Sequence, residues 1–191
     1  MKRSLLNIVA ALLVIVVVTA CVRWSFLYFY RAAYPVRYSS EVLENSAANG
    51  IEPALVFAVI RTESGFRPEV QSSVQATGLM QITPGTFLWA QMWEGEELEF
   101  EQLYDAAVNI RYGTVILRLL FEEFGTEELA LCAYHAGWGS VKRWLDDPEL
   151  SADGEILERI PFPDTAYYVD RVLKTRDTYK RLYGDFQTDS I

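Results

Sequence analysis

The pattern of apolar and polar positions divides the chain into a short apolar N-terminal segment and a longer helical region. Residues 5–22 are nearly unbroken Leu, Ile, Val and Ala. At about 1.5 Å per helical residue, such a segment nearly crosses the hydrocarbon core of a bilayer. A basic N-terminus precedes it, and aromatic residues at 24–30 follow as an interfacial belt would. We predict a membrane anchor over residues 1–30 and a linker over residues 31–38.

Two alternatives compete with a retained anchor. Val18-Thr19-Ala20 offers the small residues of a signal-peptidase site. Together with Cys21 it resembles a lipobox, in which Cys21 would be acylated and the protein would be a lipoprotein. The aromatic residues after Cys21 are unlike a polar lipoprotein tether, so the retained single-pass anchor is favoured. Each of the three outcomes places the following domain on the outer side of the membrane, and the favoured anchor holds it at the cell membrane.

After the linker, apolar residues recur at helical spacing, and Gly, Pro and capping residues separate the helices. The pattern predicts an all-α domain over residues 39–184, without a strand, and a short tail over residues 185–191. The predicted helices span residues 40–49, 53–64, 84–92, 104–124, 126–136, 140–144 and 164–183. Ser40, Thr83, Thr126, Ser140 and Asp164 are expected to cap the helices that they begin or precede. Residues 93–103 are acidic and predicted to be irregular, and residues 146–163 are predicted to form a loop.

The helix over residues 53–64 has the most informative pattern, with Pro53 in its opening turn and Gly65 just past its end. Four of its positions share one face: Val56, Val59, Ile60 and Glu63. Burial on an apolar face raises the pKa of a carboxyl group. A carboxylic acid that stays protonated near neutral pH is what general-acid catalysis requires. Glu63 is therefore the first candidate for catalysis.

The simpler interpretation of Glu63 is structural. A glutamate at the end of a helix is often solvated or paired with a nearby arginine, here Arg61 or Arg67. Perturbed carboxylates also occur in structural ion pairs, so the helix alone does not decide between the two interpretations.

Charge and composition exclude several functions. Three of the 17 basic residues and none of the 26 acidic residues precede residue 31, so the remainder carries a net charge of −12. So acidic a domain is not expected to bind nucleic acid, because that binding depends on Lys and Arg. The two cysteines, Cys21 and Cys132, do not form a disulfide framework. Cys132 lies in an apolar helical run and is expected to be a small buried residue.

The reactive side chains narrow the chemistry further. His135 is the only histidine, which argues against a histidine metal cluster, and there is no GxSxG motif or phosphate-binding GxxxxGK[ST] loop. No metal or cofactor is implied. A carboxylic acid on a buried helix, with aromatic residues that could stack on sugars, points to cleavage of a glycosidic bond.

Several motifs then resemble one family, the lytic transglycosylase (SLT) domain, which is related to goose-type lysozyme and cleaves peptidoglycan. The resemblance covers roughly residues 38–184 and depends on five motifs in order. They are Glu63-Ser64, Gly78-Leu79-Met80-Gln81, Asn109-Ile110-Arg111-Tyr112-Gly113, Ala133-Tyr134-His135-Ala136-Gly137-Trp138-Gly139 and Ile160-Pro161-Phe162-Pro163-Asp164-Thr165-Ala166-Tyr167-Tyr168-Val169. The resemblance implies a lysozyme-like helical fold behind the N-terminal helix.

The resemblance also implies roles for individual residues. Glu63 would protonate the glycosidic oxygen between N-acetylmuramic acid and N-acetylglucosamine, and then act as a base. It would deprotonate the C6 hydroxyl of the muramoyl sugar, which attacks C1 and leaves a 1,6-anhydro product. Ser72, Gln81 and Tyr134 match positions that bind the substrate, and Asp164 lies where the family has Glu, close to the groove.

Four further positions compare with the family pattern. Asn109 matches a structural position that holds the long helix against the cleft. Gln75 replaces a usual glycine, His135 replaces a usual asparagine, and Thr83 lies where methionine is frequent. A histidine beside the cleft tyrosine could make activity depend on pH near neutrality.

The expected function is that of a membrane-anchored peptidoglycan lytic transglycosylase, a monomer whose partners are glycan strands and the membrane. One alternative is a muramidase-type hydrolase on the same fold, which needs a second carboxylate such as Glu69, Asp105 or Asp164. The other is an inactive module that binds glycan or serves as a scaffold. The sequence does not distinguish cleavage at chain ends from cleavage within chains.

Overall fold

The computed structural model of the protein describes residues 2–184 and 186. The chain divides into two compact units, Met1–Pro35 and Val36–Ile191. The division falls directly after the Tyr34-Pro35 pair, within the segment 31–38 that was expected to be a linker. A residue before proline is pushed away from the helical region, so a helix tends to end there. The predicted tail over residues 185–191 lies outside the described residues except for Phe186.

The first unit is a single helix, α1 (Lys2–Ala33). Its portion Val9–Ala33 is long and apolar enough to cross a membrane, and no other helix of the described residues passes that test. The hydroxyl of Thr19 donates to the carbonyl oxygens of Ile15 and Val16 at 2.9 Å, so this polar group is satisfied within the helix. The helix extends three residues into the segment predicted as a linker, and it stops just before Tyr34-Pro35.

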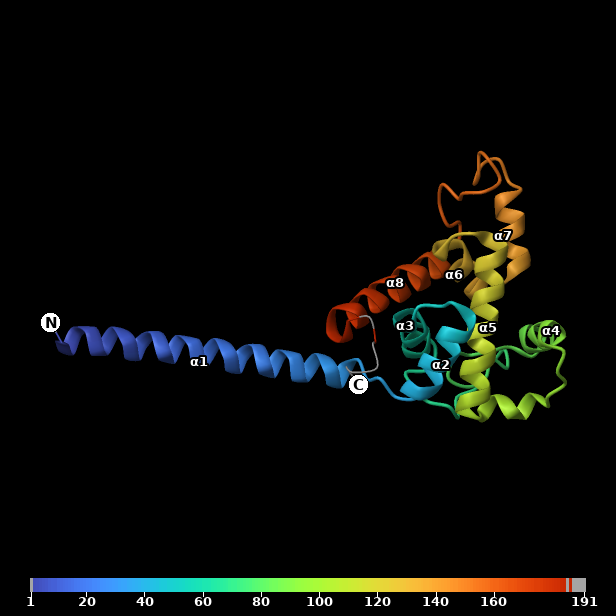
Figure 1. The fold of residues 1–191 in the computed structure, drawn as a ribbon. Helices are drawn as coiled ribbons and strands as arrows, with labels where there is room; N and C mark the ends of the chain where they lie inside the picture. The colour runs from blue at the N-terminus through green and yellow to red at the C-terminus, as the bar shows by residue number, and fades with distance from the viewer. Residues whose placement is uncertain (1, 185, 187–191) are drawn as a thin grey trace. The chain divides into compact units, whose positions relative to one another are not determined.

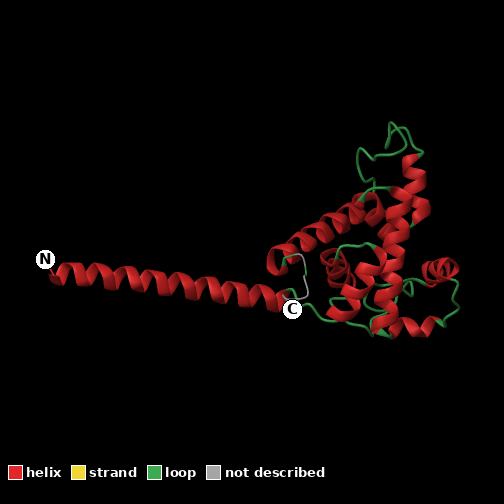
Figure 2. Ribbon diagram, in the orientation of Figure 1, coloured by secondary structure: helices red, strands yellow, loops and turns green. Residues whose placement is uncertain are grey.

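The second unit is helical, which confirms the predicted fold class (Figures 1 and 2). Among the described residues there is no β-strand, only two isolated bridges that join Thr77 to Gln71 and to Ile82. The elements are α2 (Ser39–Asn49), α3 (Pro53–Glu63), α4 (Pro84–Glu94), the 3₁₀ helix η1 (Phe100–Tyr104), α5 (Ala106–Phe124), α6 (Glu127–Ala136), α7 (Trp138–Leu145) and α8 (Pro163–Tyr183).

The core of this unit forms around α3, which packs along α8 (Figure 1). Every residue of α3 from Ala54 to Ile60 is buried, as expected for a helix that is apolar on all sides. The ring of Phe57 stacks on Tyr179 of α8 and on Phe186, with centroids 5.4 and 5.1 Å apart. The second half of the core forms where α5 packs against α2 and α6. The core therefore holds the end of α3 rigidly, and that end carries Glu63.

Two of the predicted caps are confirmed. The side chain of Thr83 accepts a hydrogen bond from the main-chain nitrogen of Thr86 at the start of α4. Thr126 accepts one from Leu129 at the start of α6. The predicted irregular segment 93–103 contains the end of α4 and most of η1, so part of it is helical.

Three other caps were predicted wrongly. α2 begins at Ser39, directly after Tyr38 at φ 59°, so Ser40 lies within the helix. α7 begins at Trp138, directly after Gly137 at φ 87° and ψ 144°, so Ser140 lies within the helix. α8 begins at Pro163, which is favoured at the first helical position because its missing N–H has no helical partner there. Asp164 therefore lies in the first turn of α8, where a negative charge is favourable beside the helix N-terminus.

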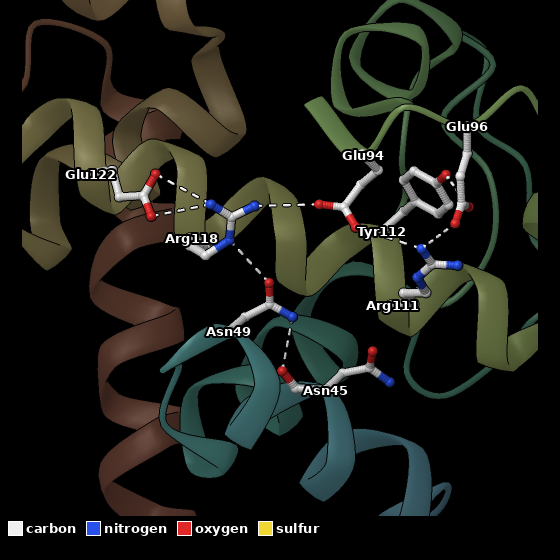
Figure 3. Close-up of polar contacts among 8 residues, drawn as sticks. All are labelled: Asn45, Asn49, Glu94, Glu96, Arg111, Tyr112, Arg118 and Glu122. Atoms are coloured by element: carbon white, nitrogen blue, oxygen red, sulfur yellow. Dashed lines mark hydrogen bonds and ion pairs between the residues drawn. The ribbon is translucent and has the colours of Figure 1, made fainter. Parts of the chain in front are cut away.

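A polar network joins α2, α5 and the segment after α4 (Figure 3). Arg118 of α5 donates to the Asn49 side chain at 3.1 Å and pairs with Glu94 at 3.4 Å. Arg111, on the same face of α5 about two turns before Arg118, pairs with Glu96 at 2.7 Å. Partly exposed ion pairs are individually worth less than about 1 kcal/mol. Their main effect is to fix the position of residues 94–96 against α5.

Candidate active site

The loop between α3 and α4 is fixed to α5 by one buried side chain. Asn109 donates to the carbonyl oxygens of Thr77 and Leu103 at 2.9 and 2.8 Å, and accepts from the main-chain nitrogen of Met80 at 2.7 Å. Gly78 lies against this side chain at φ +79°, and a Cβ there would fall 2.2 Å from Asn109 Nδ2. This arrangement agrees with the structural role expected of Asn109.

A second close approach involves the same loop. A Cβ on Gly113 of α5 would lie 2.2 Å from the sulfur of Met80, so only glycine lets the helix approach this side chain. The carbonyl oxygen of Met80 accepts a hydrogen bond of 2.7 Å from the hydroxyl of Tyr134 on α6. The GLMQ segment is thus attached to α5 on one side and α6 on the other.

Glu63 lies at the last position of α3, in a cavity of about 440 Å³. The cavity is lined by Thr62, Glu63, His135, Asp164, Tyr167, Tyr168 and Arg171. Burial raises the pKa of Glu63 to about 7, against the opposing effects of the Tyr168 hydroxyl and the Arg171 charge. Burial thus shifts the pKa in the direction needed for a carboxylic acid that stays protonated near neutral pH. Arg67, a proposed partner of Glu63, instead donates its Nε to the carbonyl oxygen of Ser64 at 2.8 Å.

Tyr168 of α8 is the aromatic neighbour of Glu63. Its hydroxyl is close enough to lower the pKa of the carboxyl group, although the contact falls outside the geometry of a regular hydrogen bond. Burial raises the pKa of Tyr168 well above its usual value, so the phenol stays protonated. The ring of His135 stacks on that of Tyr168, with centroids 4.5 Å apart. His135 Nδ1 lies 3.2 Å from the hydroxyl of Thr165, so two α8 residues position the imidazole.

Two buried hydroxyls beside Glu63 have no hydrogen-bond partner among the described residues, namely those of Thr62 and Tyr168. Both residues line the Glu63 cavity. An unpaired buried hydroxyl is unfavourable, and such groups commonly bind water or a ligand. The cavity thus offers an acid and two hydroxyls to a polar ligand.

The structure brings some of the predicted site residues together and separates others. Asp164 lines the same cavity as Glu63. Gln81 and Tyr134 line a neighbouring cavity, and the Glu63 charge acts on the Tyr134 hydroxyl, whose pKa burial raises well above its usual value. Ser72 is not among the described residues that line either cavity. Its hydroxyl accepts a hydrogen bond of 3.1 Å from the main-chain nitrogen of Ala76, and its part in binding stays a prediction.

The three departures from the family pattern have distinct structural settings. Gln75 adopts φ +61°, in the left-handed region that favours glycine. Thr83 caps α4, a task that methionine cannot perform. His135 is exposed, and the partial burial of its ring against α8 lowers its pKa, which the charge of Asp164 opposes.

Two residues of the Glu63 cavity, Tyr168 and Arg171, were not singled out from the sequence. Tyr168 belongs to the last motif, but only as part of a Tyr-Val pair. Together with Asp164 the two residues fall at i, i+4 and i+7 of α8, on one helix face. This spacing was the feature of the sequence that could have identified Tyr168 and Arg171 as neighbours of Asp164.

The fold and the acid in its cavity define a lysozyme-like helical domain with a candidate glycosidase-type site. Comparison with known proteins assigns the family: the model of the transglycosylase SLT domain matches residues 41–156. The chain belongs to this family.

Two proteins with similar sequences are named as lytic murein transglycosylases. The chain is 33% identical over 159 residues to the soluble lytic murein transglycosylase of Escherichia coli, a match that covers 81% of this chain and 25% of that protein. It is 28% identical over 169 residues to the membrane-bound lytic murein transglycosylase C of Glaesserella parasuis, covering 76% of this chain and 46% of the relative. The chain thus spans about a quarter of the first relative and under half of the second.

The similarity extends to solved structures. An inactive mutant of the lytic transglycosylase Slt from Pseudomonas aeruginosa superimposes with a TM-score of 0.69 at 34% identity, covering 79% of this chain and 25% of that one. The soluble lytic transglycosylase of Escherichia coli, whose complex with bulgecin A is also solved, gives 0.72 at 29% identity, covering 82% and 26%.

Proposed function

We propose that this protein is a membrane-anchored lytic transglycosylase that cleaves the bond between N-acetylmuramic acid and N-acetylglucosamine in peptidoglycan. The observation that carries the proposal is Glu63, whose pKa of about 7 keeps much of the carboxyl group protonated at neutral pH. Its cavity also contains the buried Thr62 hydroxyl, which has no hydrogen-bond partner among the described residues and can bond to a polar substrate. The names of the relatives support the substrate class.

In the proposed reaction, the Glu63 carboxyl group donates its proton to the glycosidic oxygen as the bond to C1 breaks. The resulting carboxylate accepts the proton of the C6 hydroxyl, whose oxygen attacks C1 of the same sugar. The product is a 1,6-anhydro sugar, no water is consumed, and Glu63 ends protonated. The Tyr168 hydroxyl and Arg171 favour the carboxylate form, because both lower the pKa of Glu63. They would therefore stabilise the intermediate stage of the reaction.

A hydrolase is the second candidate, and one observation favours it. Asp164, unlike the other carboxylates considered, lines the same cavity as Glu63 and could position a water molecule. Asp105 is engaged elsewhere, since its side chain accepts hydrogen bonds from Ala107 and Val108 at the start of α5. The hydrolase therefore depends on Asp164.

The proposal also includes a single-pass anchor with the catalytic domain outside the cytoplasmic membrane. The apolar length of α1 and the membrane-bound relative support membrane association. The basic N-terminus supports the orientation.

The experiment is mass spectrometry of the products released from purified peptidoglycan by the full chain in detergent. Three variants are compared with it: Glu63→Gln, Asp164→Asn and Glu97→Gln, the last a change at an exposed acidic residue that lines neither cavity. We expect products that end in 1,6-anhydro-muramic acid from the native chain and from Glu97→Gln, and none from Glu63→Gln.

Two results would contradict the proposal. Reducing-end muramic acid, lost in Asp164→Asn, would establish a hydrolase. No release from the native chain would favour a binding module instead.

A further inference from the structure

Helix α4 carries apolar side chains on both its inner and its outer side, but only the inner side is covered. The inner side packs chiefly against α5. Its buried members are Phe87, Ala90 and Gln91. The outer side carries Leu88, Met92 and Trp93, which are 63%, 76% and 65% exposed, and α4 lies at the edge of the domain (Figure 1). A helix with apolar residues all round is normally buried, so the outer side of α4 is a surface that a partner can cover.

The three outer residues form one continuous stripe. Leu88 and Met92 are one helical turn apart, and Trp93 follows Met92 directly. Among the described residues after Pro35, no other helix carries more than one large apolar residue that is exposed. Isolated exposed apolar side chains are ordinary, whereas a contiguous group marks an interaction surface. We call Leu88, Met92 and Trp93 the α4 stripe.

The α4 stripe lies outside the machinery proposed for the reaction. Its three residues are not among those that line the cavity of Glu63. Nor are they among those that line the cavity of Gln81 and Tyr134. Contact with the reacting bond therefore does not explain why this side of the helix is apolar.

The chain turns back along α4 after the helix ends. The main-chain nitrogen of Leu98 donates a hydrogen bond to the side-chain oxygen of Gln91. The ring of Phe100 meets that of Phe87 edge-on, with centroids 6.5 Å apart. These two contacts hold residues 98–100 against the helix.

This returning segment places two carboxylates beside α4. Glu97 directly precedes Leu98, and Glu101 directly follows Phe100. Both glutamates are exposed, and neither forms an ion pair with another residue that the structure describes. The helix that carries the α4 stripe thus has an acidic margin, formed by Glu97 and Glu101, whose charges are not neutralised within the domain.

The acidic margin decides between the possible occupants of the α4 stripe. A bilayer surface with anionic lipids attracts basic segments and would repel these carboxylates. Two copies of this chain that paired through their α4 stripes would bring two acidic margins together, which is unfavourable. A partner with an apolar face and basic residues beside that face gains from both parts of the surface.

We propose that the α4 stripe is a docking surface for another protein, which contributes an amphipathic helix with basic residues along the edge of its apolar face. Leu88, Met92 and Trp93 pack against the apolar face, and Glu97 and Glu101 pair with the Lys or Arg residues. This inference goes beyond the proposed function and does not depend on it, because recognition needs neither Glu63 nor a glycan strand.

The test uses as its probe a synthetic helical peptide of Leu and Lys, spaced to give one apolar and one basic face. The full chain is held in nanodiscs of phosphatidylcholine, because detergent would cover the apolar residues. Fluorescence anisotropy of the labelled peptide measures binding, and empty nanodiscs give the background. We expect saturable binding by the native chain. A second peptide, with Glu in place of every Lys, should bind about tenfold more weakly or worse.

Leu88→Ser and Trp93→Ala are expected to weaken binding of the Lys peptide about tenfold each, the usual cost of removing a central apolar contact. Ile156→Ser is the matched control, because Ile156 is 63% exposed, like Leu88, and lies in the loop after α7. We expect its affinity to equal that of the native chain. All three variants should release the same products from peptidoglycan as the native chain, which would show that each is folded.

The acidic margin is tested by the double variant Glu97→Gln/Glu101→Gln. We expect it to bind the Lys peptide about threefold more weakly at low salt, and to lose less affinity than the native chain as salt is added. Glu149→Gln/Glu158→Gln is the control, because it makes the same change in net charge at two exposed glutamates in the loop after α7. Its affinity should equal that of the native chain.

Four results would overturn the inference. Equal affinity in Leu88→Ser, Trp93→Ala and Ile156→Ser would show that the α4 stripe does not bind the probe. Equal binding of the Lys and Glu peptides would exclude a basic partner. Cross-linked dimers that form without the probe, and are lost in Trp93→Ala, would make a second copy the occupant. In chain labelled with 5-fluorotryptophan, a shift of the Trp93 resonance when phosphatidylglycerol is added to the nanodiscs would make the bilayer the occupant.

Discussion

Asn109 accepts a hydrogen bond of 2.7 Å from the main-chain nitrogen of Met80 and donates to carbonyl oxygens on two other segments. One fully buried amide thus fixes the loop at Met80, directly before Gln81, while the Tyr134 hydroxyl bonds to the carbonyl oxygen of the same Met80. The geometry of the cavity lined by Gln81 and Tyr134 therefore depends on a side chain that does not line it.

Replacing Asn109 by alanine is expected to destabilise the protein by about 3 kcal/mol or more, because three buried partners lose their hydrogen bonds. Thermal or urea unfolding of the full chain in detergent measures this change. Asn45→Ala is the matched control, since its amide donates only to Glu41 on the same partly exposed helix, and a cost below about 1 kcal/mol is expected. Equal losses in the two variants would contradict the role of Asn109.

Gln75→Gly is expected to stabilise the protein. The native backbone holds this residue at φ +61°, which costs a non-glycine residue roughly 1–2 kcal/mol. Part of that gain is offset because glycine loses more conformational freedom on folding. The midpoint of thermal unfolding should rise by a few degrees, about 2–4 °C per kcal/mol for a domain of this size. Gln75→Ala, which keeps the strain, should show no such rise, and a rise of the same size there would contradict the explanation.

The pKa of His135 predicts a change of stability at mildly acidic pH. Burial lowers this pKa, so the folded state resists protonation of the ring. The contribution of the neutral ring to the free energy of unfolding is fully present above the pKa of the unfolded state, about 6.5. It is lost as pH falls through the lowered pKa of the folded state. The groups around the ring are Tyr168, Thr165 and Asp164 of α8 and Glu63 of α3.

His135→Asn removes this titration while keeping a group that can bond to Thr165. We expect unfolding midpoints of the native chain to fall from pH 7 to pH 5 by more than those of His135→Asn. Activity at pH 7 should differ little between the two, because the imidazole is neutral there. Identical pH dependence of stability in both proteins would show that His135 does not titrate in this way.

The raised pKa of Glu63 predicts a pH dependence of stability with the opposite sign. Its folded pKa of about 7 lies above the usual 4.5, so the stability from the protonated form is fully present below pH 4.5 and is lost as pH rises through 7. At pH 8 Glu63→Gln should therefore be more stable than the native chain, by up to roughly 3 kcal/mol for a shift of this size. At pH 4.5 the difference should largely vanish. Chemical unfolding at both pH values measures the free energies of unfolding of the two proteins. An equal difference between them at pH 4.5 and at pH 8 would exclude a raised pKa of Glu63.

The sequence allowed prediction of most helices and of the apolar helix face that ends in Glu63, because both depend on local periodicity. The apolar face that ends in Glu63 lies within one helix, and every residue of α3 between Ala54 and Ile60 is indeed buried. The start of α7 was missed because it depends on the unusual backbone of Gly137 rather than on a capping side chain.

The surroundings of Glu63 were harder to predict because they come from distant helices. Tyr168 and Arg171 reach the acid only because α8 packs along α3. The pairing of Trp89 with Trp138 around one cavity likewise depends on how α4 and α7 meet. Helical spacing shows that Asp164, Tyr168 and Arg171 share one face of α8, but it does not show which other helix that face packs against.

The central claim is that burial holds Glu63 in its acid form near neutral pH, and a direct measurement of its pKa tests this. The full chain, labelled with ¹³C at the glutamate carboxyl carbons, is titrated by NMR in detergent, and the Glu63 resonance is assigned by its absence in Glu63→Gln. We expect this carboxyl group to titrate near pH 7. A midpoint near the usual 4.5 would contradict the account, because the group would then be ionised at neutral pH and could not serve as the acid.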